Sequence, residues 1–393
     1  MSGTGAGSPA PRVALVAGTL APGGAEKQLL YLVRALRSLR ADVMVYSLTR
    51  GELYESALTE LGVEPRWIGR YSSPALRTLA LAAALRDFRP HIVQSAHFYT
   101  NLYVSLVAPM YGALSIGTAR SDIVHEVNAN GRWGRWLLRL PGSLLVNSHA
   151  ARENAVAYGR DGGDVHVLSN VIDLAAFDAS VVRARDGERA ALPIAAGSER
   201  GEMIVVGVGT FIRAKRFDRF LRAIALARSL GTPVRGVLAG DGPEAASLEQ
   251  LARELGLLPD GVSFVGRRGD IPALLSGSDV LLLTSEHEGF PNVVLEAMAA
   301  GLPVVATPAG DAPAVVRDGV TGFVVPHDDI EAMAAKLALL AASPESRAQL
   351  GAAGRREVEL SFAAEGFAAR VAASYRAIAL RRGHARSLAV LPA

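Results

Sequence analysis

The chain has 393 residues, more than one hydrophobic core usually organises, so two domains are expected. Hydrophobic residues make up 50% and charged residues 20%, a composition that excludes a disordered or fibrous protein. The net charge of +3 is too small to indicate nucleic acid as a partner, and the absence of cysteine excludes disulfides and thiolate metal sites.

Residues 1–11 are expected to be disordered, and they lack the cationic and apolar regions of a signal peptide. Together with the missing cysteines, this favours a cytoplasmic protein. Residues 90–119 contain no charged side chain, but His, Gln, Asn, Pro and Gly interrupt the stretch. The stretch therefore predicts a buried strand followed by a buried helix rather than a membrane span.

Short β-branched runs alternate with helical segments in the first part of the chain. Residues 26–39 repeat Leu and Val at helical spacing, which gives this helix one apolar face. Strands are expected at 12–18, 41–48, 91–95, 143–148 and 164–170. The alternation is typical of a parallel sheet with helical crossovers, and it predicts an N-terminal Rossmann-like domain over residues 12–180.

A charged, Gly- and Ala-rich stretch follows, and residues 181–200 are expected to link two domains. The alternation then restarts and predicts a second Rossmann-like domain over residues 201–365. Its strands are expected at 203–209, 234–240, 262–266, 279–285 and 303–308, with helices at 217–230, 244–255, 271–276 and 292–300. The fold class is therefore α/β, with two βαβ domains facing a central cleft and ligands bound at the carboxyl ends of their strands.

The densest group of candidate residues follows the strand at 279–285. A loop carries Glu288, and a helix opens at Pro291–Asn292 with Glu296 about one turn inside it. The first amides of a helix and its dipole favour an anion. A carboxylate beside phosphate is unfavourable, so Glu296 suits neutral ribose hydroxyls and Glu288 suits a sugar. The alternative is that both glutamates are only solvated.

A second group, Arg213, Lys215 and Arg216, follows the strand at 203–209. Three cations at the carboxyl end of a strand suit a diphosphate, because they can neutralise charge that builds on a leaving group. A solvated basic loop is the alternative. No third glycine follows Gly207 and Gly209, so the dinucleotide-binding fingerprint is absent.

Weaker candidates occupy other loops. Gly23 and Gly24 at a helix start permit positive φ and close approach of backbone to a ligand. Gly240 lies in a turn that can pass close to a flat base, and His97 follows the strand at 91–95, where a structural role is the alternative. Asn147 and Ser148 end another strand and suit a helix cap as well as a site.

Several metal and phosphate motifs are missing from the sequence. There is no Asp-x-Asp, HExxH or GxxxxGK[ST], so the chain shows no carboxylate cradle for Mg²⁺, no zincin site and no P-loop. We therefore expect no metal and no bound cofactor, with charge on a leaving diphosphate met by side chains and amides.

The combined pattern resembles the retaining GT-B glycosyltransferases of family 4, whose mark is two glutamates separated by seven residues. Here these are Glu288 and Glu296, followed by EAMAAGLPVVAT and DGVTGFVVP. PGGAEKQL, LSNVIDLAAF, KRFDRFLRAIA, AGDGPE and SFAAEGFAARVAASYRAI extend the likeness over nearly the whole chain from about residue 12. The resemblance implies a GT-B fold whose final helix, residues 366–393, returns to the N-terminal domain.

The resemblance also implies roles for individual residues. Lys215 and a nearby arginine would bind the donor diphosphate, Glu296 the ribose, and Glu288 and His97 the transferred sugar. The candidate catalytic residues are Glu288, His97, Arg213 and Lys215. The candidate donor contacts are Gly23, Gly24, Gly209, Arg213, Lys215, Gly240, Gly289, Phe290, Pro291, Asn292, Val293 and Glu296, and the candidate acceptor contacts are Arg120 and Asn147.

One departure from the family pattern concerns the arginine. Many members have it directly after the glycine that ends the first strand of the second domain, whereas this chain has Gly209-Thr210. Arg213 or Arg216 is expected to replace it. A second departure is Asn170-Val171 at the interdomain step, where Asn-Gly is commoner, and this is expected to affect a turn rather than the chemistry.

The expected reaction is the metal-independent transfer of a hexose-type sugar from a nucleoside-diphosphate sugar, with UDP as the expected nucleotide, to an acceptor hydroxyl. By resemblance, the anomeric configuration is retained through front-face attack. The alternatives are a nucleotide-sugar epimerase or inverting transferase on the same fold, and a non-catalytic binding protein.

The acceptor is expected to be a glycan, a lipid-linked molecule or a small molecule. Residues 132–139, with three arginines and two tryptophans, are expected to lie at a bilayer surface or, alternatively, to form an acceptor-side helix or a packed loop. The motifs do not identify the donor base, the sugar, the acceptor or the oligomeric state. A homodimer is left open.

Overall fold

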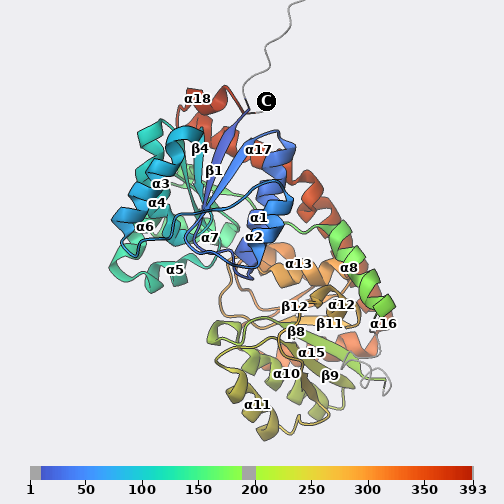
Figure 1. Ribbon diagram of the computed structural model, residues 1–393. Coiled ribbons are helices and arrows are strands. Elements are labelled where there is room, and N and C mark those ends of the chain that lie inside the picture. Colours follow the sequence, from blue (N-terminus) through green and yellow to red (C-terminus); the bar gives the residue numbers. More distant parts are fainter. Residues whose placement is uncertain (1–9, 188–200, 392–393) are drawn as a thin grey trace, which may run out of the picture. The chain divides into compact units, whose positions relative to one another are not determined.

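The computed structural model describes residues 10–187 and 201–391, which form two compact units. One unit contains the residues up to Val171 together with those from Ala364 onward, and the other contains Ile172–Ala363 (Figure 1). Most of the expected N-terminal tail and residues 188–200 of the expected linker lie outside the described residues. The boundary at Val171 is earlier than the expected residue 180, because the helix that follows packs within the second unit.

The first unit is built on a parallel, seven-stranded sheet. Its strands run in the order β3 (Arg66–Trp67), β2 (Asp42–Ser47), β1 (Arg12–Ala17), β4 (Ile92–Ser95), β5 (Leu114–Ala119), β6 (Ser143–Val146) and β7 (Val165–Val167). Its helices are α1 (Gly24–Ser38), α2 (Tyr54–Glu60), α3 (Pro74–Phe88), α4 (Asn101–Val107), α5 (Ile123–Ala129), α6 (Gly134–Arg139), α7 (His149–Ala157), α17 (Phe367–Arg381) and α18 (Ala385–Leu388).

The second unit is built on a parallel, six-stranded sheet. Its strands run in the order β10 (Val262–Phe264), β9 (Val234–Ala239), β8 (Met203–Val208), β11 (Val280–Leu283), β12 (Val304–Ala306) and β13 (Gly322–Val324). Its helices are α8 (Leu174–Gly187), α10 (Phe217–Ser229), α11 (Ala245–Glu254), α12 (Ile271–Ser276), α13 (Asn292–Ala299), α14 (Ala312–Val315), α15 (Ile330–Ala342) and α16 (Pro344–Glu357).

The predicted α/β class with two Rossmann-like parallel sheets is confirmed. Residues 90–119 fold as β4, a helical segment and β5, so the prediction of a strand and a helix there missed a second strand. No helix within 10–187 and 201–391 is long and apolar enough to cross a membrane. The apolar runs of this stretch are instead explained by burial between the helices that cover the sheet.

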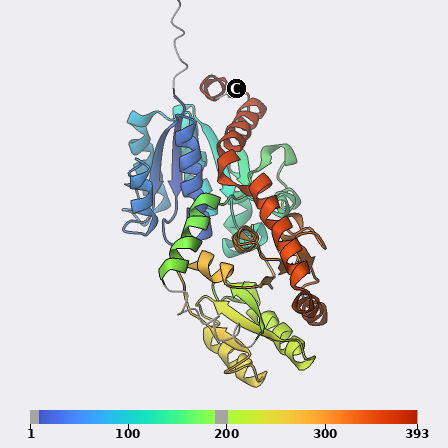
Figure 2. The same cartoon turned by 90° about the vertical axis from the view of Figure 1, so that its right-hand side faces the viewer.

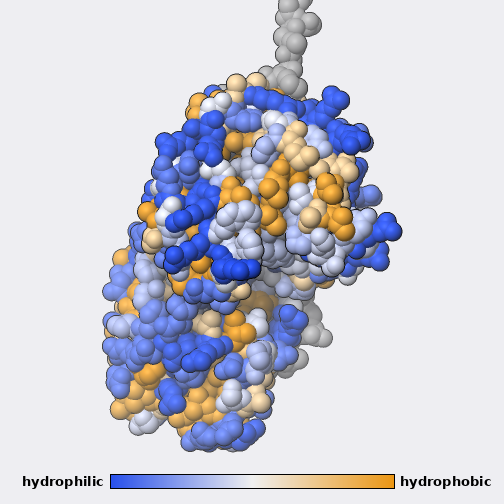
Figure 3. Space-filling model, turned by 90° about the vertical axis from the view of Figure 1, so that its left-hand side faces the viewer, coloured by the Kyte–Doolittle hydropathy of each residue, from blue (hydrophilic) through white to orange (hydrophobic). Residues whose placement is uncertain are grey.

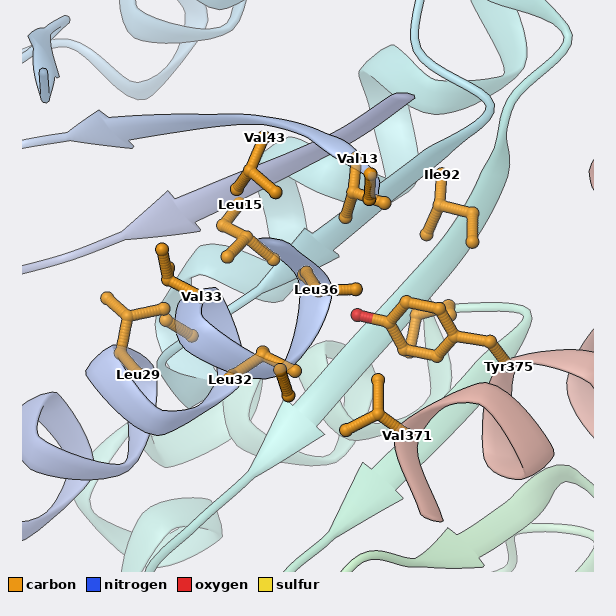
Figure 4. Close-up of a cluster of buried hydrophobic side chains, with 14 of the residues drawn as sticks. Val13, Leu15, Leu29, Leu32, Val33, Leu36, Val43, Ile92, Val371 and Tyr375 are labelled. Atoms are coloured by element: carbon orange, nitrogen blue, oxygen red, sulfur yellow. The ribbon is translucent and has the colours of Figure 1, made fainter. Parts of the chain in front are cut away.

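The last long helix belongs to the first unit. In Figure 2, α17 runs beside α1, and the close-up in Figure 4 shows Tyr375 and Val371 facing Leu32 and Leu36 above the strands. The Tyr375 hydroxyl donates to Gln94 Oε1 at 2.5 Å, and burial raises the pKa of this tyrosine. Residues distant in sequence thus complete the core of one domain.

Candidate active site

Most of the candidate residues cluster at the carboxyl ends of four strands, whereas Arg120, Asn147 and Gly240 follow β5, β6 and β9. The four strands are the neighbours β1 and β4 in the first sheet and the neighbours β8 and β11 in the second sheet. In each sheet the strand order reverses between the two neighbours, which is where open α/β sheets bind their ligands. Each unit therefore presents one candidate edge.

Glu288 is held from two sides at the edge of the second sheet. Lys215 Nζ lies 2.6 Å from Glu288 Oε1, and the Ser285 hydroxyl donates to the same oxygen at 2.7 Å. Only 10% of the Glu288 side chain and 24% of the Lys215 side chain are exposed. Partial burial strengthens the pair relative to an exposed one. Glu288 and Lys215, two of the candidate catalytic residues, are therefore in direct contact.

The backbone fixes the distance between these two loops. The Thr284 hydroxyl donates to the Lys215 carbonyl at 3.1 Å, and the Glu286 amide donates to the Ala214 carbonyl at 2.8 Å. These bonds join the loop after β8 to the loop after β11 directly beneath the Lys215–Glu288 pair. The position of the pair is therefore set by main-chain hydrogen bonds as well as by its own charges.

Helix α13 begins directly beyond this loop. Pro291 precedes its first residue, and Phe290 is buried with its ring 5.9 Å from that of Phe362. Val293 in the first turn lines a small cavity together with Lys215 and Ser285. Glu296 is partly buried in the second turn. The positive end of a helix dipole thus opens close to the Lys215 side chain, which suits an anion.

A glycine after β12 was missed by the sequence analysis. Gly310 has φ of 55°, and a Cβ atom there would lie 2.6 Å from the Glu288 carbonyl oxygen and 2.8 Å from that of Gly289. Thr307 in the same loop donates to the Ser285 carbonyl at 2.6 Å. This loop supports the backbone of the Glu288 loop. The TPAG sequence at residues 307–310, directly after β12, was the sequence signal that could have identified this glycine.

The arginines beside Lys215 do not accompany its side chain. The turn η6 (Arg213–Lys215) has about three residues per turn, so residues two apart point in different directions. Arg213 is exposed and lines a cavity of about 520 Å³ with Glu244 and Ser247. Arg216 lines the same cavity and forms ion pairs with Asp218 and Glu286.

Gly240 has no room for a side chain, whereas Gly209 has ordinary space around it. A Cβ atom on Gly240 would lie 1.8 Å from the Gly209 carbonyl oxygen, and one on Gly209 would be in ordinary contact with the Lys215 side chain. The two loops run side by side, with the Gly209 amide donating to the Ala239 carbonyl at 3.0 Å. Gly240 thus allows the loop after β9 to approach the loop that leads to Lys215.

His97 is the centre of the edge in the first unit. Its Nδ1 accepts a hydrogen bond from the Gly18 amide at 3.0 Å, so the ring proton lies on Nε2, which donates to Glu26 Oε1 at 3.0 Å. Glu26 is buried in the first turn of α1, and the Tyr99 ring stacks on His97 at 5.8 Å. Both ring nitrogens of His97 therefore have protein partners.

Gly23 serves this arrangement in a way that the sequence did not predict. Its φ is −167°, which is extended backbone, so positive φ is not the reason for a glycine there. A Cβ atom would lie 2.2 Å from Glu26 Oε2. Gly23 therefore provides room for Glu26 at the helix start, and Gly24 is the first residue of α1.

Glu52 is a second residue that the sequence analysis missed. It follows β2 and accepts hydrogen bonds from the hydroxyls of Thr19 and Thr49 and from the Leu20 amide. Burial opposes the charged form, but these hydrogen bonds outweigh it, so the pKa of Glu52 lies below its ordinary value. Its long-range partners gave no local sequence signal.

The two candidate acceptor residues belong to one hydrogen-bonded group. The Asn147 side-chain amide donates to the Arg120 carbonyl at 2.8 Å, and Arg120 donates to Asn170 Oδ1 at 3.1 Å. Burial lowers the pKa of Arg120 to about 10. Asn147 Oδ1 is buried with no hydrogen-bond partner. The neighbouring Ser148, not Asn147, caps α7.

The described ranges contain no group of three or more His, Cys, Asp or Glu side chains placed to hold a metal ion. The charges that face each other at the edge of the second unit are instead those of Lys215, Arg216 and Arg219 against carboxylates. What this edge offers a ligand is therefore ammonium and guanidinium groups, hydroxyls and the start of a helix.

Two family models match the chain. Residues 22–176 match the model described as Glycosyltransferase Family 4, and residues 189–357 match Glycosyl transferases group 1. The putative glycosyltransferase EpsF of Bacillus subtilis is 30% identical over 307 residues, which cover 72% of this chain and 75% of the relative.

Other relatives match over shorter stretches. N-acetyl-alpha-D-glucosaminyl L-malate synthase of Bacillus anthracis is 33% identical over 171 residues, or 43% of this chain and 44% of the relative. The match spans about half the length of the first curated relatives. The crystal structure of HepE from Anabaena with UDP-glucose has a TM-score of 0.78 at 20% identity, covering 92% of this chain and 98% of that chain. This last likeness shows the shared fold.

Proposed function

Because the chain belongs to glycosyltransferase family 4 and has the GT-B type of fold, we propose that it transfers a hexose-type sugar from a UDP-linked donor to an acceptor hydroxyl, with retention of the anomeric configuration. The transferred sugar belongs to the glucose, N-acetylglucosamine, galactose or mannose class. The acceptor is a glycan, a glycolipid or a glycosylated natural product.

One observation carries this proposal, namely the meeting of Lys215 and Glu288 at the start of α13. The 2.6 Å pair places a cation for the donor diphosphate beside a carboxylate that can accept hydrogen bonds from sugar hydroxyls. Glu296, in the second turn of α13, is assigned to the ribose hydroxyls. In this proposal, Lys215 and the start of α13 bind the diphosphate, Glu288 binds the sugar and Glu296 binds the ribose.

In the proposed reaction, the bond between the anomeric carbon and the donor phosphate oxygen breaks, and a bond to the acceptor oxygen forms on the same face of the sugar. The acceptor proton passes to the leaving phosphate oxygen. Lys215 stabilises the charge that grows on the leaving diphosphate, and preorganised charges of this kind accelerate reactions because they need no rearrangement in the transition state. No side chain forms a covalent bond to the sugar.

The UDP assignment draws support from HepE, whose crystal structures hold UDP and UDP-glucose. Thermal shift with UDP-, GDP-, ADP- and TDP-sugars tests it, and a UDP-sugar is expected to give the largest stabilisation. Nucleotide release with candidate acceptors follows, with and without EDTA, and we expect equal rates. Loss of activity in EDTA would contradict a metal-independent transfer.

The anomeric configuration of the product, determined by NMR, tests the reaction type. A retained configuration is expected, and an inverted one would support an inverting transferase. Formation of a rearranged nucleotide-sugar without any acceptor would support an epimerase. A binding protein without catalysis would bind the nucleotide-sugar but release no nucleotide in the presence of any acceptor.

A surface of the first unit supports a further part of the proposal, peripheral contact with an anionic membrane. Trp133 and Trp136 are 56% and 43% exposed, and Arg132 and Arg135 flank them. Figure 3 shows one side of the first unit, on which residues of high Kyte–Doolittle hydropathy are interspersed with hydrophilic ones. Exposed tryptophans between arginines suit the boundary between headgroups and acyl chains.

Flotation with phosphatidylcholine vesicles, with and without phosphatidylglycerol, tests this contact. Binding is expected only with the anionic lipid, and the double change Trp133→Ala and Trp136→Ala is expected to abolish it. Trp67→Ala is the matched control, because Trp67 is exposed and stacked with an arginine elsewhere in the unit. Equal flotation of both variants would contradict the proposed contact.

A further inference from the structure

A buried guanidinium lies behind the loop that carries Glu288. Arg219, in the first turn of α10, is 1% exposed and is among the largest fully buried side chains of the described chain. A buried charge without partners is strongly unfavourable. Its position therefore has to be explained by the groups that it bonds.

Arg219 bonds to the end of β11 and to the loop beyond it. Its Nη1 donates to the Thr284 carbonyl at 3.3 Å, and its Nη2 donates to Glu286 Oε2. On the other side, Asp328 Oδ1 accepts from Nε at 3.0 Å and from Nη2 at 2.7 Å. One guanidinium thus ties helix α10 to both Thr284 and Glu286.

Arg216 reaches the same carboxylate from the start of α10. It donates to Glu286 Oε2 at 3.2 Å and binds Asp218 with two hydrogen bonds of 2.9 and 3.0 Å. The backbone of Arg216 is left-handed, with φ of 49°, which is uncommon for a residue with a side chain. The Asp218 pair and the Glu286 bond hold it in that conformation. We call Arg216, Arg219 and Glu286 the loop clamp.

The loop clamp adjoins the bonds that place the Lys215–Glu288 pair. Thr284 and Glu286, the two residues held by Arg219, are the same two that bond to the carbonyls of Lys215 and Ala214. Ser285 between them donates to Glu288. A shift of Glu286 would therefore move both members of the pair, although Arg219 itself is not bonded to either of them.

We propose that Arg219 is a positioning residue that acts through Glu286 and Thr284 to hold Lys215 and Glu288 at the separation needed to bind the donor diphosphate. The proposal rests on the proposed function, because it takes Lys215 as the diphosphate ligand. A misplacement of about 1 Å can reduce a rate on the order of 100-fold, so a remote guanidinium with this connection has a measurable effect.

The two carboxylates that accept hydrogen bonds from Arg219 provide a matched test. Glu286→Gln and Asp328→Asn each remove one negative charge beside the same guanidinium, but only Glu286 lies in the loop that is bonded to the carbonyls of Ala214 and Lys215. We expect Glu286→Gln to weaken UDP binding by about 10-fold in calorimetry, and Asp328→Asn to leave it within about twofold. Equal effects would overturn the proposal and make Arg219 a structural residue of the unit.

The arginine itself is tested with a control on the same helix. Arg219→Lys keeps the charge but loses the fork of donors, whereas Arg228→Lys alters the pair with Glu202 at the other end of α10. Arg219→Lys is expected to weaken UDP binding by about 10-fold and Arg228→Lys to have no effect. If Arg219→Lys does not fold, the Glu286→Gln comparison remains decisive.

A double-mutant cycle shows whether the effect passes through Lys215. In a Lys215→Ala background, Arg219→Lys is expected to cause no further loss of UDP affinity, because the group that it positions is gone. Full additivity would overturn the proposal. If the wild-type chain binds no UDP and releases no nucleotide, the proposed function has failed. If it does both and the variants behave like their controls, only the loop clamp has failed.

Discussion

The two sheet edges share a topology but differ in their electrostatics. At the first edge, Glu26 and Glu52 accept hydrogen bonds from an imidazole, hydroxyls and an amide. At the second edge, Glu288 and Glu286 accept from an ammonium and two guanidinium groups. The fold therefore fixes where a ligand binds, while the residues in the loops fix its chemistry. The second edge suits an anion and the first suits neutral hydroxyls.

The largest expected effect comes from Lys215→Ala, which tests the cationic side of this comparison. Removing the ammonium leaves the partly buried Glu288 without its counter-charge and, in the proposed reaction, removes the cation that stabilises the leaving diphosphate. We expect kcat/KM to fall by about 10²- to 10³-fold, as for other preorganised charges. Nucleotide release under saturating acceptor measures it.

Lys336→Ala is the control for this change. Lys336 lies in the same unit and stacks over Phe323, away from Glu288, so its removal is expected to leave kcat/KM unchanged. A Lys215→Ala enzyme with wild-type activity would mean that the second edge does not bind the diphosphate, and the electrostatic contrast between the edges would lose its functional meaning.

The next largest effect is expected from Gly310→Ala, because it changes the Glu288 loop without removing a charge. The added methyl group would push against the carbonyls of Glu288 and Gly289. Gly319→Ala is matched to it, since Gly319 also has positive φ, 71°, but open space around it. We expect about a 10-fold lower kcat/KM for Gly310→Ala only, and a loss of thermal stability in both variants that is larger for Gly310→Ala.

The residues of the second edge were predictable because they are close in sequence. Glu288, Pro291 and Glu296 lie on one loop and helix, so spacing alone predicted that they gather at the start of a helix. The contacts of Glu52 and Gly310 were not predictable, although the TPAG sequence marked a turn at Gly310. Glu52 acts through contacts with Thr19 and Leu20, about thirty residues away, and Gly310 acts through room for a distant backbone.

Local geometry explains the other differences. The three cations of the second edge were grouped by sequence, but Lys215 pairs with Glu288 whereas Arg213 and Arg216 line a cavity with Glu244 and Ser247. Strand β5 was hidden in an uncharged stretch that offered no change in polarity to mark its start. Periodicity predicted five of the seven strands in the first sheet and five of the six in the second, because these strands are apolar runs between helices, and it missed β3, β5 and β13.

A smaller effect, on stability, is expected at the first edge from His97→Ala. The change leaves the Gly18 amide and the buried Glu26 carboxylate without their partner. The expected cost is about 1–3 kcal/mol, measured as the free energy of unfolding in urea. UDP affinity is expected to change little, because both ring nitrogens are bonded within the first unit. A large loss of UDP affinity with unchanged stability would contradict this and make His97 a donor contact.

The smallest expected effect is a pH dependence of stability that involves Glu52. Its pKa in the folded chain lies below the ordinary value of 4.5, because hydrogen bonds to its charged form outweigh the effect of burial. The resulting stabilisation is complete above the unfolded pKa and is lost as the pH falls through the lower, folded pKa. Glu52→Gln is therefore expected to flatten the decline of the urea midpoint below about pH 4.5.

The pKa of Glu286 is lowered as well, but its strongest stabilising partners are guanidinium groups, so added salt should weaken its contribution to stability more than that of Glu52. Equal salt dependence in Glu52→Gln and Glu286→Gln would remove the electrostatic distinction between the two edges.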